Sequence, residues 1–383
     1  MNLLIGLAAF LSVGGLAFAE PLQIRRLDGS AISVAEADRM AAEVLRANGV
    51  TGAQMAVIDR GRVVWMRAFG MRRLEPAFPM RTDTSIWAAS ITKGVFADYV
   101  VGHSGVALDE PVARQLGAPL ESFKEYTDKA TVLVADPRWP LVTPRMLLAH
   151  TSGLANFAFL EPDKKMRLHA APGAAYRYSG EGLNLLQLLV EQKHGRPLDV
   201  LMQEAVFGPL GMTRTGMIYR EEFGENVADR FGADGKFLAQ TRRFPARAAG
   251  SMATTVEDLA KYAVALMDGR TVKALTKPAV RIRTVHQFPR TGDADEGEEA
   301  GRVGLAYGLG WGLLTKTRFG PAFFKEGHGD GATNYMICFP KRKACMILLT
   351  NSENGERAFR PLLEGIFGNT VTPWEWEGYL FAK

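Results

Sequence analysis

Hydrophobic residues follow a strand-like pattern near both ends of the chain. Residues 52–59 and 62–69 are rich in β-forming side chains and are joined at Asp59-Arg60-Gly61, which predicts a β-hairpin. Apolar runs return near the C-terminus, and they predict strands at 307–315, 332–339 and 344–351.

Helical signals lie between these strands and beside them. Ser33 and Glu36 form a capping box, which predicts a helix ending at Asn48-Gly49. Residues 180–195 have helical periodicity and end at a glycine. Further helices are predicted from about Ser90, from Thr143-Pro144, within 251–269 and near 355–368.

Residues from about 110 to 245 contain loops and helices without convincing strand pairs. Because strands occur at both ends of the chain, we expect a discontinuous α/β domain made of residues 20–110 and 245–383. A mostly helical domain, residues 111–244, is then inserted between its two parts. The fold class is α/β (α+β), with an antiparallel sheet flanked by helices.

The N-terminus resembles a secretory signal peptide. Residues 3–18 are almost wholly apolar, and Ala17-Phe18-Ala19 is a small-x-small cleavage pattern before Glu20. We therefore predict a signal peptide at residues 1–19, cleaved after Ala19, and a secreted or periplasmic protein without a membrane span after cleavage. An uncleaved membrane anchor is the alternative.

Composition excludes some classes of function. The 383 residues are 47% hydrophobic, which is enough for a large core, and the net charge of +5 includes no dense Lys/Arg run. No nucleic-acid partner is expected. We found no metal-ligand spacing, phosphate loop or dinucleotide fingerprint, so neither a metal nor another cofactor is predicted. Cys338 and Cys345 flank a predicted hairpin turn and form either a disulfide or two buried thiols.

The sharpest chemical signal is Ser90-Ile91-Thr92-Lys93. Residues three apart on a helix share a face, so the serine hydroxyl and the lysine amine can meet. The start of a helix favours a nearby oxyanion, and an apolar setting lowers the pKa of a lysine, so that it can act as a base.

The chain resembles the serine β-lactamase and penicillin-binding-protein superfamily. It is most similar to the branch of class C β-lactamases, D-alanyl-D-alanine carboxypeptidases and β-lactamase-like esterases. The resemblance rests on the order of several runs, which are GAQMAVIDRGRVVWMRAFG, SITK, TPRMLLAHTSGL, PGAAYRYSGEGLNLLQLLVE, GPLGMTRTGM, AAGSMATTVEDLAKY, YGLGW and GHGDGATNYMICFP. It implies the β-lactamase/transpeptidase-like fold and a serine hydrolase that forms an acyl-enzyme on a small ester, amide or peptide substrate.

The resemblance also implies roles for individual residues. Ser90 would be the nucleophile, with Lys93 and Tyr178 as its proton-transfer partners. The third motif, Lys-Thr-Gly or His-x-Gly in the family, is matched to His328-Gly329-Asp330 and would contact substrate. The backbone N–H groups of Ser90 and Gly331 would form the oxyanion hole. His150 matches a structural position of the family.

Two residues depart from the family pattern. Gly180 stands where the second motif has Asn, and Asp330 stands where the third motif has Gly. Both departures favour a carboxyl-esterase or narrow peptidase over a β-lactamase. A class C-like β-lactamase, a D-alanyl-D-alanine carboxypeptidase and a penicillin-binding sensor that acylates without turnover remain alternatives.

Overall fold

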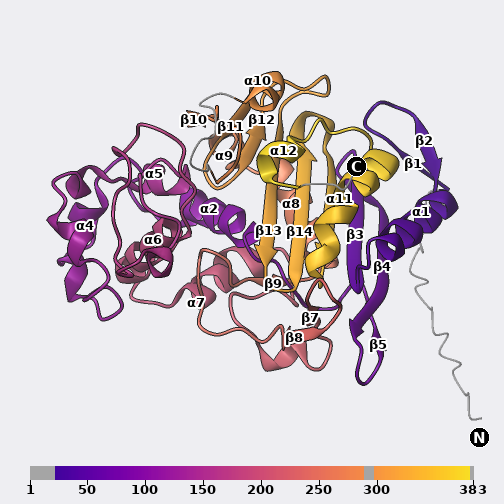
Figure 1. Ribbon diagram of the computed structural model, residues 1–383, viewed down its shortest axis with the longest axis horizontal. Coiled ribbons are helices and arrows are strands. Elements are labelled where there is room, and N and C mark those ends of the chain that lie inside the picture. Colours follow the sequence, from indigo (N-terminus) through magenta and orange to yellow (C-terminus); the bar gives the residue numbers. More distant parts are fainter. Residues whose placement is uncertain (1–21, 289–296, 380–383) are drawn as a thin grey trace, which may run out of the picture.

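The computed structural model describes residues 22–288 and 297–379, and the predicted signal peptide lies outside these ranges. Its centre is a nine-stranded antiparallel sheet in the order β10-β11-β12-β13-β14-β15-β3-β4-β5 (Figure 1). The strands of this sheet are β3 (Gly52–Asp59), β4 (Arg62–Arg73), β5 (Phe78–Pro79), β10 (Val280–Arg281), β11 (Leu305–Tyr307), β12 (Gly312–Leu314), β13 (Ala322–Gly329), β14 (Ala332–Phe339) and β15 (Ala344–Thr350). Strands from both parts of the chain share one sheet, as the sequence predicted.

The predicted hairpin is confirmed by the pairing of β3 with β4. Its turn residues Arg60 and Gly61 have φ values of 51° and 76°, which match a two-residue turn that follows the natural twist of the strands. One predicted strand was wrong, because residues 307–315 divide into β11 and β12. Gly310 has a φ of 81°, and a Cβ there would lie 2.4 Å from the Ala97 side chain, so the chain turns where it meets a helix.

Short strand pairs complete the β structure. They are β1 (Gln23–Arg25) with β2 (Ala31–Ser33), β6 (Ile86–Trp87) with β9 (Ala253–Thr254), and β7 (Asp229–Phe231) with β8 (Phe237–Gln240). The β7–β8 pair corrects the prediction that residues 110–245 hold no strand pair. These strands are only three and four residues long and β8 is half exposed, so they carry little hydrophobic alternation.

The helices surround the sheet. They are α1 (Val34–Ala47), α2 (Ile91–His103), α3 (Val112–Gln115), α4 (Thr131–Ala135), α5 (Pro144–Leu148), α6 (Gly180–His194), α7 (Leu198–Met202), α8 (Val256–Asp268), α9 (Val272–Leu275), α10 (Glu298–Val303), α11 (Glu356–Leu362) and α12 (Trp374–Glu377). Helices α4, α5 and α6 lie at the end of the molecule opposite α1 and β4, as Figure 1 shows. This arrangement suits the predicted helical insertion, whose boundaries at 111 and 244 stay a prediction.

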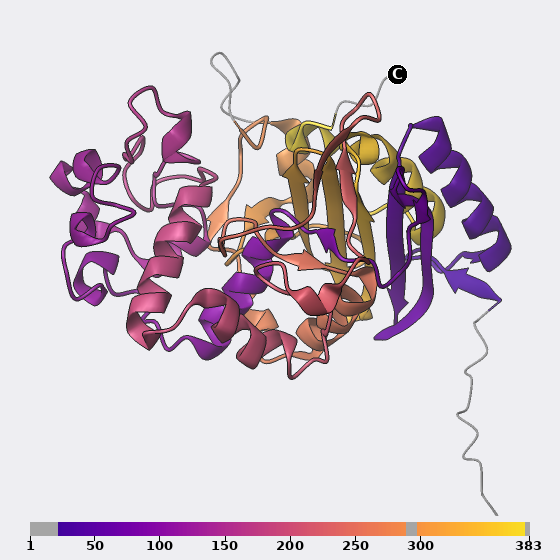
Figure 2. The same ribbon diagram turned by 90° about the horizontal axis from the view of Figure 1, so that it is seen from below.

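Alternation along the central strands creates two separate cores. On β3, Ala56 and Ile58 belong to the core that contains α2 and α8, whereas Met55 and Val57 belong to the core beneath α1 and α11. Since successive strand residues point to opposite faces, a sheet covered on both faces is nearly all apolar. The result is a three-layer arrangement with helices on both sides of the sheet (Figures 1 and 2).

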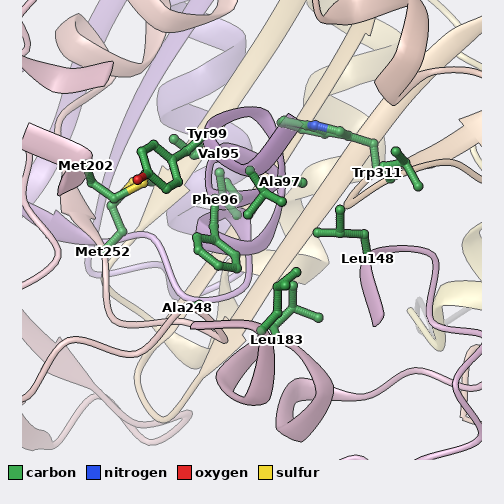
Figure 3. Packing of buried hydrophobic residues seen from close by; sticks show 14 of the residues in the cluster. Val95, Phe96, Ala97, Tyr99, Leu148, Leu183, Met202, Ala248, Met252 and Trp311 are labelled. Carbon is green, nitrogen blue, oxygen red and sulfur yellow. The ribbon is translucent and has the colours of Figure 1, made fainter. Parts of the chain in front are cut away.

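Helix α2 is buried on nearly all sides, which explains its continuous apolar sequence. Figure 3 shows Phe96 and Ala97 among side chains from distant segments, including Leu183 and Trp311. Gly94 is required because a Cβ there would lie 2.5 Å from the Trp311 ring. This packing fixes the position of the helix whose first residue follows Ser90.

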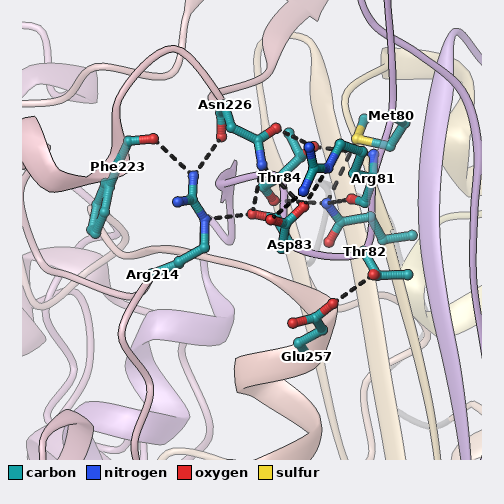
Figure 4. A network of polar contacts seen from close by, with 10 residues as sticks. Met80, Arg81, Thr82, Asp83, Thr84, Arg214, Phe223, Asn226 and Glu257 are labelled. Atoms are coloured by element: carbon teal, nitrogen blue, oxygen red, sulfur yellow. Dashed lines mark hydrogen bonds and ion pairs between the residues drawn. The ribbon is translucent and has the colours of Figure 1, made fainter.

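A polar network anchors the segment that leads into α2 (Figure 4). The Arg214 guanidinium donates to the backbone oxygens of Asp83, Phe223 and Asn226 at 2.5, 2.8 and 3.0 Å. The Asn226 amide donates to the Asp83 carboxylate at 3.0 Å. These bonds join the segment before α2 to the middle of the chain.

Cys338 and Cys345 face each other on β14 and β15 and form a disulfide. The sequence did not distinguish a disulfide from two buried thiols. The register of the two strands pairs Cys338 directly with Cys345, which brings the two sulfur atoms together. Within the described ranges, no helix combines the length and apolarity needed to cross a membrane.

Candidate active site

Ser90 lies at the entrance to α2, where a strained residue sets its direction. Ala89 has a φ of 46°, a left-handed conformation that costs a non-glycine residue about 1–3 kcal/mol. Ser90 is the N-cap of the helix, but its hydroxyl makes no cap hydrogen bond. The hydroxyl is therefore available for chemistry.

Lys93 reaches back along the first turn of α2 to this hydroxyl. Its Nζ lies 2.8 Å from Ser90 Oγ and also bonds the Ala249 carbonyl. The side chain is 1% exposed. Burial, followed by the positive charge of Lys325, lowers the pKa of Lys93. A lysine with a lowered pKa can accept the serine proton.

Tyr178 is the third predicted member, and the structure brings it to the same place. The Nζ atoms of Lys93 and Lys325 lie 5.0 and 5.1 Å from its ring centroid. Burial would raise the pKa of Tyr178, but the charges of Lys325 and Lys93 outweigh it, and the pKa falls below that of a free phenol. Tyr178 therefore loses its proton more readily than a free phenol does.

His150 positions the tyrosine without carrying charge. Its Nδ1 accepts a hydrogen bond from the Ser179 N–H at 3.1 Å, and its ring lies 4.4 Å from that of Tyr178. Burial and then the two lysine charges hold the pKa of His150 well below its usual value. The scaffold role predicted for this histidine agrees with these contacts.

Sequence reasoning missed Lys325 and Glu326 on β13. Lys325 is fully buried, and its Nζ lies 2.5 Å from a Glu326 carboxylate oxygen. Burial alone would lower the pKa of Lys325, but the Glu326 charge raises it. The sequence contains a signal for them, because Lys325-Glu326-Gly327 is a Lys-x-Gly run that begins three residues before His328-Gly329-Asp330.

Gly327 explains why this run lies at the site. A Cβ at Gly327 would lie 2.4 Å from the Ala88 carbonyl, so β13 runs directly against the segment before Ser90. Asn334 on β14 strengthens this contact by donating to the Trp87 carbonyl at 3.0 Å.

The four residues matched to the third motif and oxyanion hole have different surroundings. His328 lies at the cavity wall, and its Nε2 is 3.0 Å from a Glu356 carboxylate oxygen. Gly329 packs against the Trp87 indole, and the Asp330 carbonyl accepts from Arg230. Gly331 packs against Arg230 and Phe231 and is outside the cavity lining.

A cavity of about 530 Å³ opens over Ser90. Its floor contains Ser90, Lys93 and Tyr178, and its walls are both aromatic and charged. The aromatic, polar and charged residues of the walls are Trp87, Glu125, Lys129, Asn156, Phe157, Phe159, Glu181, Asn184, Arg243, Arg247, Gln287, Phe288, Glu326 and His328. Among the residues that the structure describes, no group of three or more His, Cys, Asp or Glu side chains could hold a metal.

Phe157 accounts for the unusual Gly180. A Cβ at Gly180 would lie 2.2 Å from the Phe157 ring, so the ring occupies the space of any side chain there. Phe157 also stacks on Phe159 with centroids 5.1 Å apart. An aromatic wall thus stands where the family pattern has an amide, and Asn184 instead accepts a bond from the Ala249 N–H at 3.2 Å.

Comparison with known proteins agrees with this architecture. The beta-lactamase family profile matches residues 37–367, and the chain therefore belongs to the beta-lactamase family. Esterase EstB from Burkholderia gladioli is 31% identical over 51% of this chain and 54% of its own length. The chain thus aligns with only about half of that esterase.

Two further relatives cover more of their own length. The D-alanyl-D-alanine-carboxypeptidase/endopeptidase AmpH of Escherichia coli K12 is 24% identical over 82% of this chain and 83% of its own. The octameric penicillin-binding protein homologue from Pyrococcus abyssi superimposes with a TM-score of 0.69 at 20% identity, covering 90% of this chain and 80% of that one. The structural likeness confirms the predicted fold class.

Proposed function

We propose that this protein is a serine hydrolase that cleaves small carboxylic esters or amides through a Ser90 acyl-enzyme. The observation that carries the proposal is the buried Lys93 amine 2.8 Å from Ser90 Oγ, beside a tyrosine held between two lysines. A nucleophile, a base and a second proton carrier in contact are what acyl transfer to water requires.

In the acylation step, Ser90 Oγ attacks the substrate carbonyl carbon while Lys93 and Tyr178 take up its proton. The carbonyl π electrons move to oxygen, and the tetrahedral intermediate then collapses. The bond to the leaving group breaks as Tyr178 returns the proton to that group. Water attacks the ester in the second step, and the same residues pass its proton back to Ser90.

Lys325 takes the role for which the sequence suggested His328. It is the basic β13 side chain beside Tyr178, and its charge favours the phenolate. We propose the Ser90 backbone N–H as one donor of the oxyanion hole. The second donor is a backbone N–H of β13 in the segment from Glu326 to His328. Both of these residues line the cavity, whereas Gly331 does not.

The walls favour an ester that places an apolar group beside Phe157 and Phe288 over a β-lactam. Phe157 fills the position of the family's amide contact, and Phe288 packs on Tyr178 with ring centroids 5.3 Å apart. The esterase relative supports this choice, although the carboxypeptidase relative keeps a D-peptidase as the second candidate. We also propose that export by the N-terminal signal places the enzyme in the periplasm or outside the cell.

The test compares 4-nitrophenyl butyrate with nitrocefin, using Ser90→Ala as the blank. We expect ester hydrolysis by the native enzyme, little nitrocefin turnover, and complete loss of hydrolysis in Ser90→Ala. Hydrolysis that persists in Ser90→Ala would remove Ser90 as nucleophile. A lasting mass adduct after exposure to a β-lactam, without any turnover, would favour the penicillin-binding sensor instead.

A further inference from the structure

The charged residues in the wall of the cavity are paired, with one exception. Lys129 lies 2.8 Å from Glu181 and 3.1 Å from Glu125, and Arg247 lies 3.5 Å from Glu125. Glu326 forms its ion pair with Lys325 below the floor. Arg243 is the exception, since no carboxylate of the described residues lies within 4.0 Å of its guanidinium.

Arg243 is held by an aromatic ring and not by a counter-ion. Its guanidinium carbon lies 4.0 Å from the centroid of a Trp87 ring, and its buried Nε has no hydrogen-bond partner among the residues that the structure describes. Stacking on an indole leaves the edge of a guanidinium free to donate hydrogen bonds in its plane. Arg243 and Trp87, which lies three residues before Ser90, both line the cavity.

A second guanidinium adds to the positive field. The Arg230 guanidinium carbon lies 4.9 Å from the centroid of a Trp87 ring, and its Nη1 donates to the Asp330 carbonyl at 2.6 Å. Within the described part of the chain, its buried Nε has no hydrogen-bond partner. Burial and then the Arg230 charge lower the pKa of Arg243. The charge of the Asp330 carboxylate works against this lowering and raises the pKa of both arginines, but the carboxylate forms an ion pair with neither.

Two half-buried guanidiniums on one indole repel each other and have lost part of their hydration. Such an arrangement is stabilised when an anion binds between or beside them. Planar guanidinium donors match a carboxylate with two parallel hydrogen bonds. The lining near Trp87 thus has the chemistry of an anion subsite in the cavity that also contains Ser90.

We propose that Arg243, supported by Arg230 and Trp87, binds a carboxylate at the far end of the substrate's acyl group. This inference rests on the proposed function and specifies its substrate class as esters or amides of dicarboxylic acids. Tyr178 delivers a proton to the leaving group, so the leaving group lies on the Tyr178 side. We place the acyl chain along the part of the lining that contains Arg243 and Trp87, where the Trp87 Nε1–H also donates to the Gly250 carbonyl.

The test uses two esters with the same leaving group and the same five-carbon acyl chain. One is 4-nitrophenyl pentanoate, and the other is mono(4-nitrophenyl) glutarate, which ends in a carboxylate. We expect kcat/KM to be at least about tenfold higher for the glutarate ester, the usual scale of a charge-assisted hydrogen bond. In Arg243→Gln this preference should disappear, whereas Arg243→Lys should keep part of it.

Arg247→Gln is the matched control, because it removes a positive charge from the same wall at a side chain that is already paired. Its preference for the glutarate ester should equal that of the native enzyme. A native enzyme without this preference, or an Arg243→Gln variant that retains it, would overturn the anion subsite. An equal loss of the glutarate preference in Arg247→Gln would also overturn it. That result would show that the preference comes from the overall positive charge of the cavity and not from a site at Arg243.

Failure of the inference and failure of the proposed function are distinguishable. If the neutral pentanoate ester is hydrolysed in a Ser90-dependent way without a preference for the glutarate ester, only the subsite is wrong. A binding measurement is independent of turnover. Free glutarate titrated into Ser90→Ala should bind at least about tenfold more tightly than into Ser90→Ala/Arg243→Gln.

Discussion

The contact between Gly180 and Phe157 makes a quantitative prediction about the second motif. A Cβ at position 180 would lie 2.2, 2.4 and 3.0 Å from three Phe157 ring atoms. The ring must retreat by more than about 1 Å to reach an ordinary carbon–carbon distance. Phe157 is only half-buried, so the ring can move partly toward the cavity. We expect Gly180→Ala to lower the free energy of unfolding by about 1–3 kcal/mol, the usual cost of overpacking.

A double-mutant cycle isolates this contact. Phe157→Ala removes the obstructing ring, so Gly180→Ala in that background should cost less than about 0.5 kcal/mol. Urea unfolding of the four proteins, followed by circular dichroism, measures the coupling. Equal costs of Gly180→Ala in both backgrounds would refute the steric explanation for the glycine.

The same cycle has a functional counterpart. Gly180→Asn alone should reduce ester hydrolysis, because the displaced Phe157 ring enters the cavity. Gly180→Asn combined with Phe157→Ala restores both the amide and the space of the family pattern. We expect the double variant to turn over nitrocefin faster than the native protein, measured as initial rates of the absorbance change.

The remaining predictions concern the floor of the cavity and the disulfide. Lys93→Ala and Tyr178→Phe should each lower kcat by at least about 10²-fold, and rates within a fewfold of the native enzyme would remove that residue from the mechanism. The Glu326 charge raises the pKa of both Lys93 and Tyr178, so Glu326→Gln should move the acidic limb of the kcat/KM profile to lower pH, and an unchanged or raised limb would contradict this. Cys338 and Cys345 close a loop with a sequence separation of 7, so reducing the bond should lower the free energy of unfolding by about 2 kcal/mol, measured by urea unfolding with and without dithiothreitol.

Local sequence patterns determined much of this protein. The β3–β4 hairpin, the helix after Ser90 and the meeting of strands from both ends of the chain follow from periodicity and turn residues. The Ser90–Lys93 contact was predictable for the same reason, since a helical spacing of three places both side chains on one face.

Only the tertiary structure decided which residue of β13 faces Tyr178. The sequence offers a basic residue at both Lys325 and His328, and a shift of three positions along a strand reverses the face. The contact of Gly327 with the Ala88 carbonyl fixes the register and brings Lys325 into the site.

The same limit applies to the cavity wall. The residues near Gly180 in the sequence do not indicate that Phe157, 23 positions earlier, fills the space of a side chain there. The residues near Arg243 likewise do not indicate that it stacks on Trp87. Periodicity reports the local face on which a side chain lies. Contacts between distant segments depend on how the helices and the sheet pack together, and these contacts shape the space in which substrate binds.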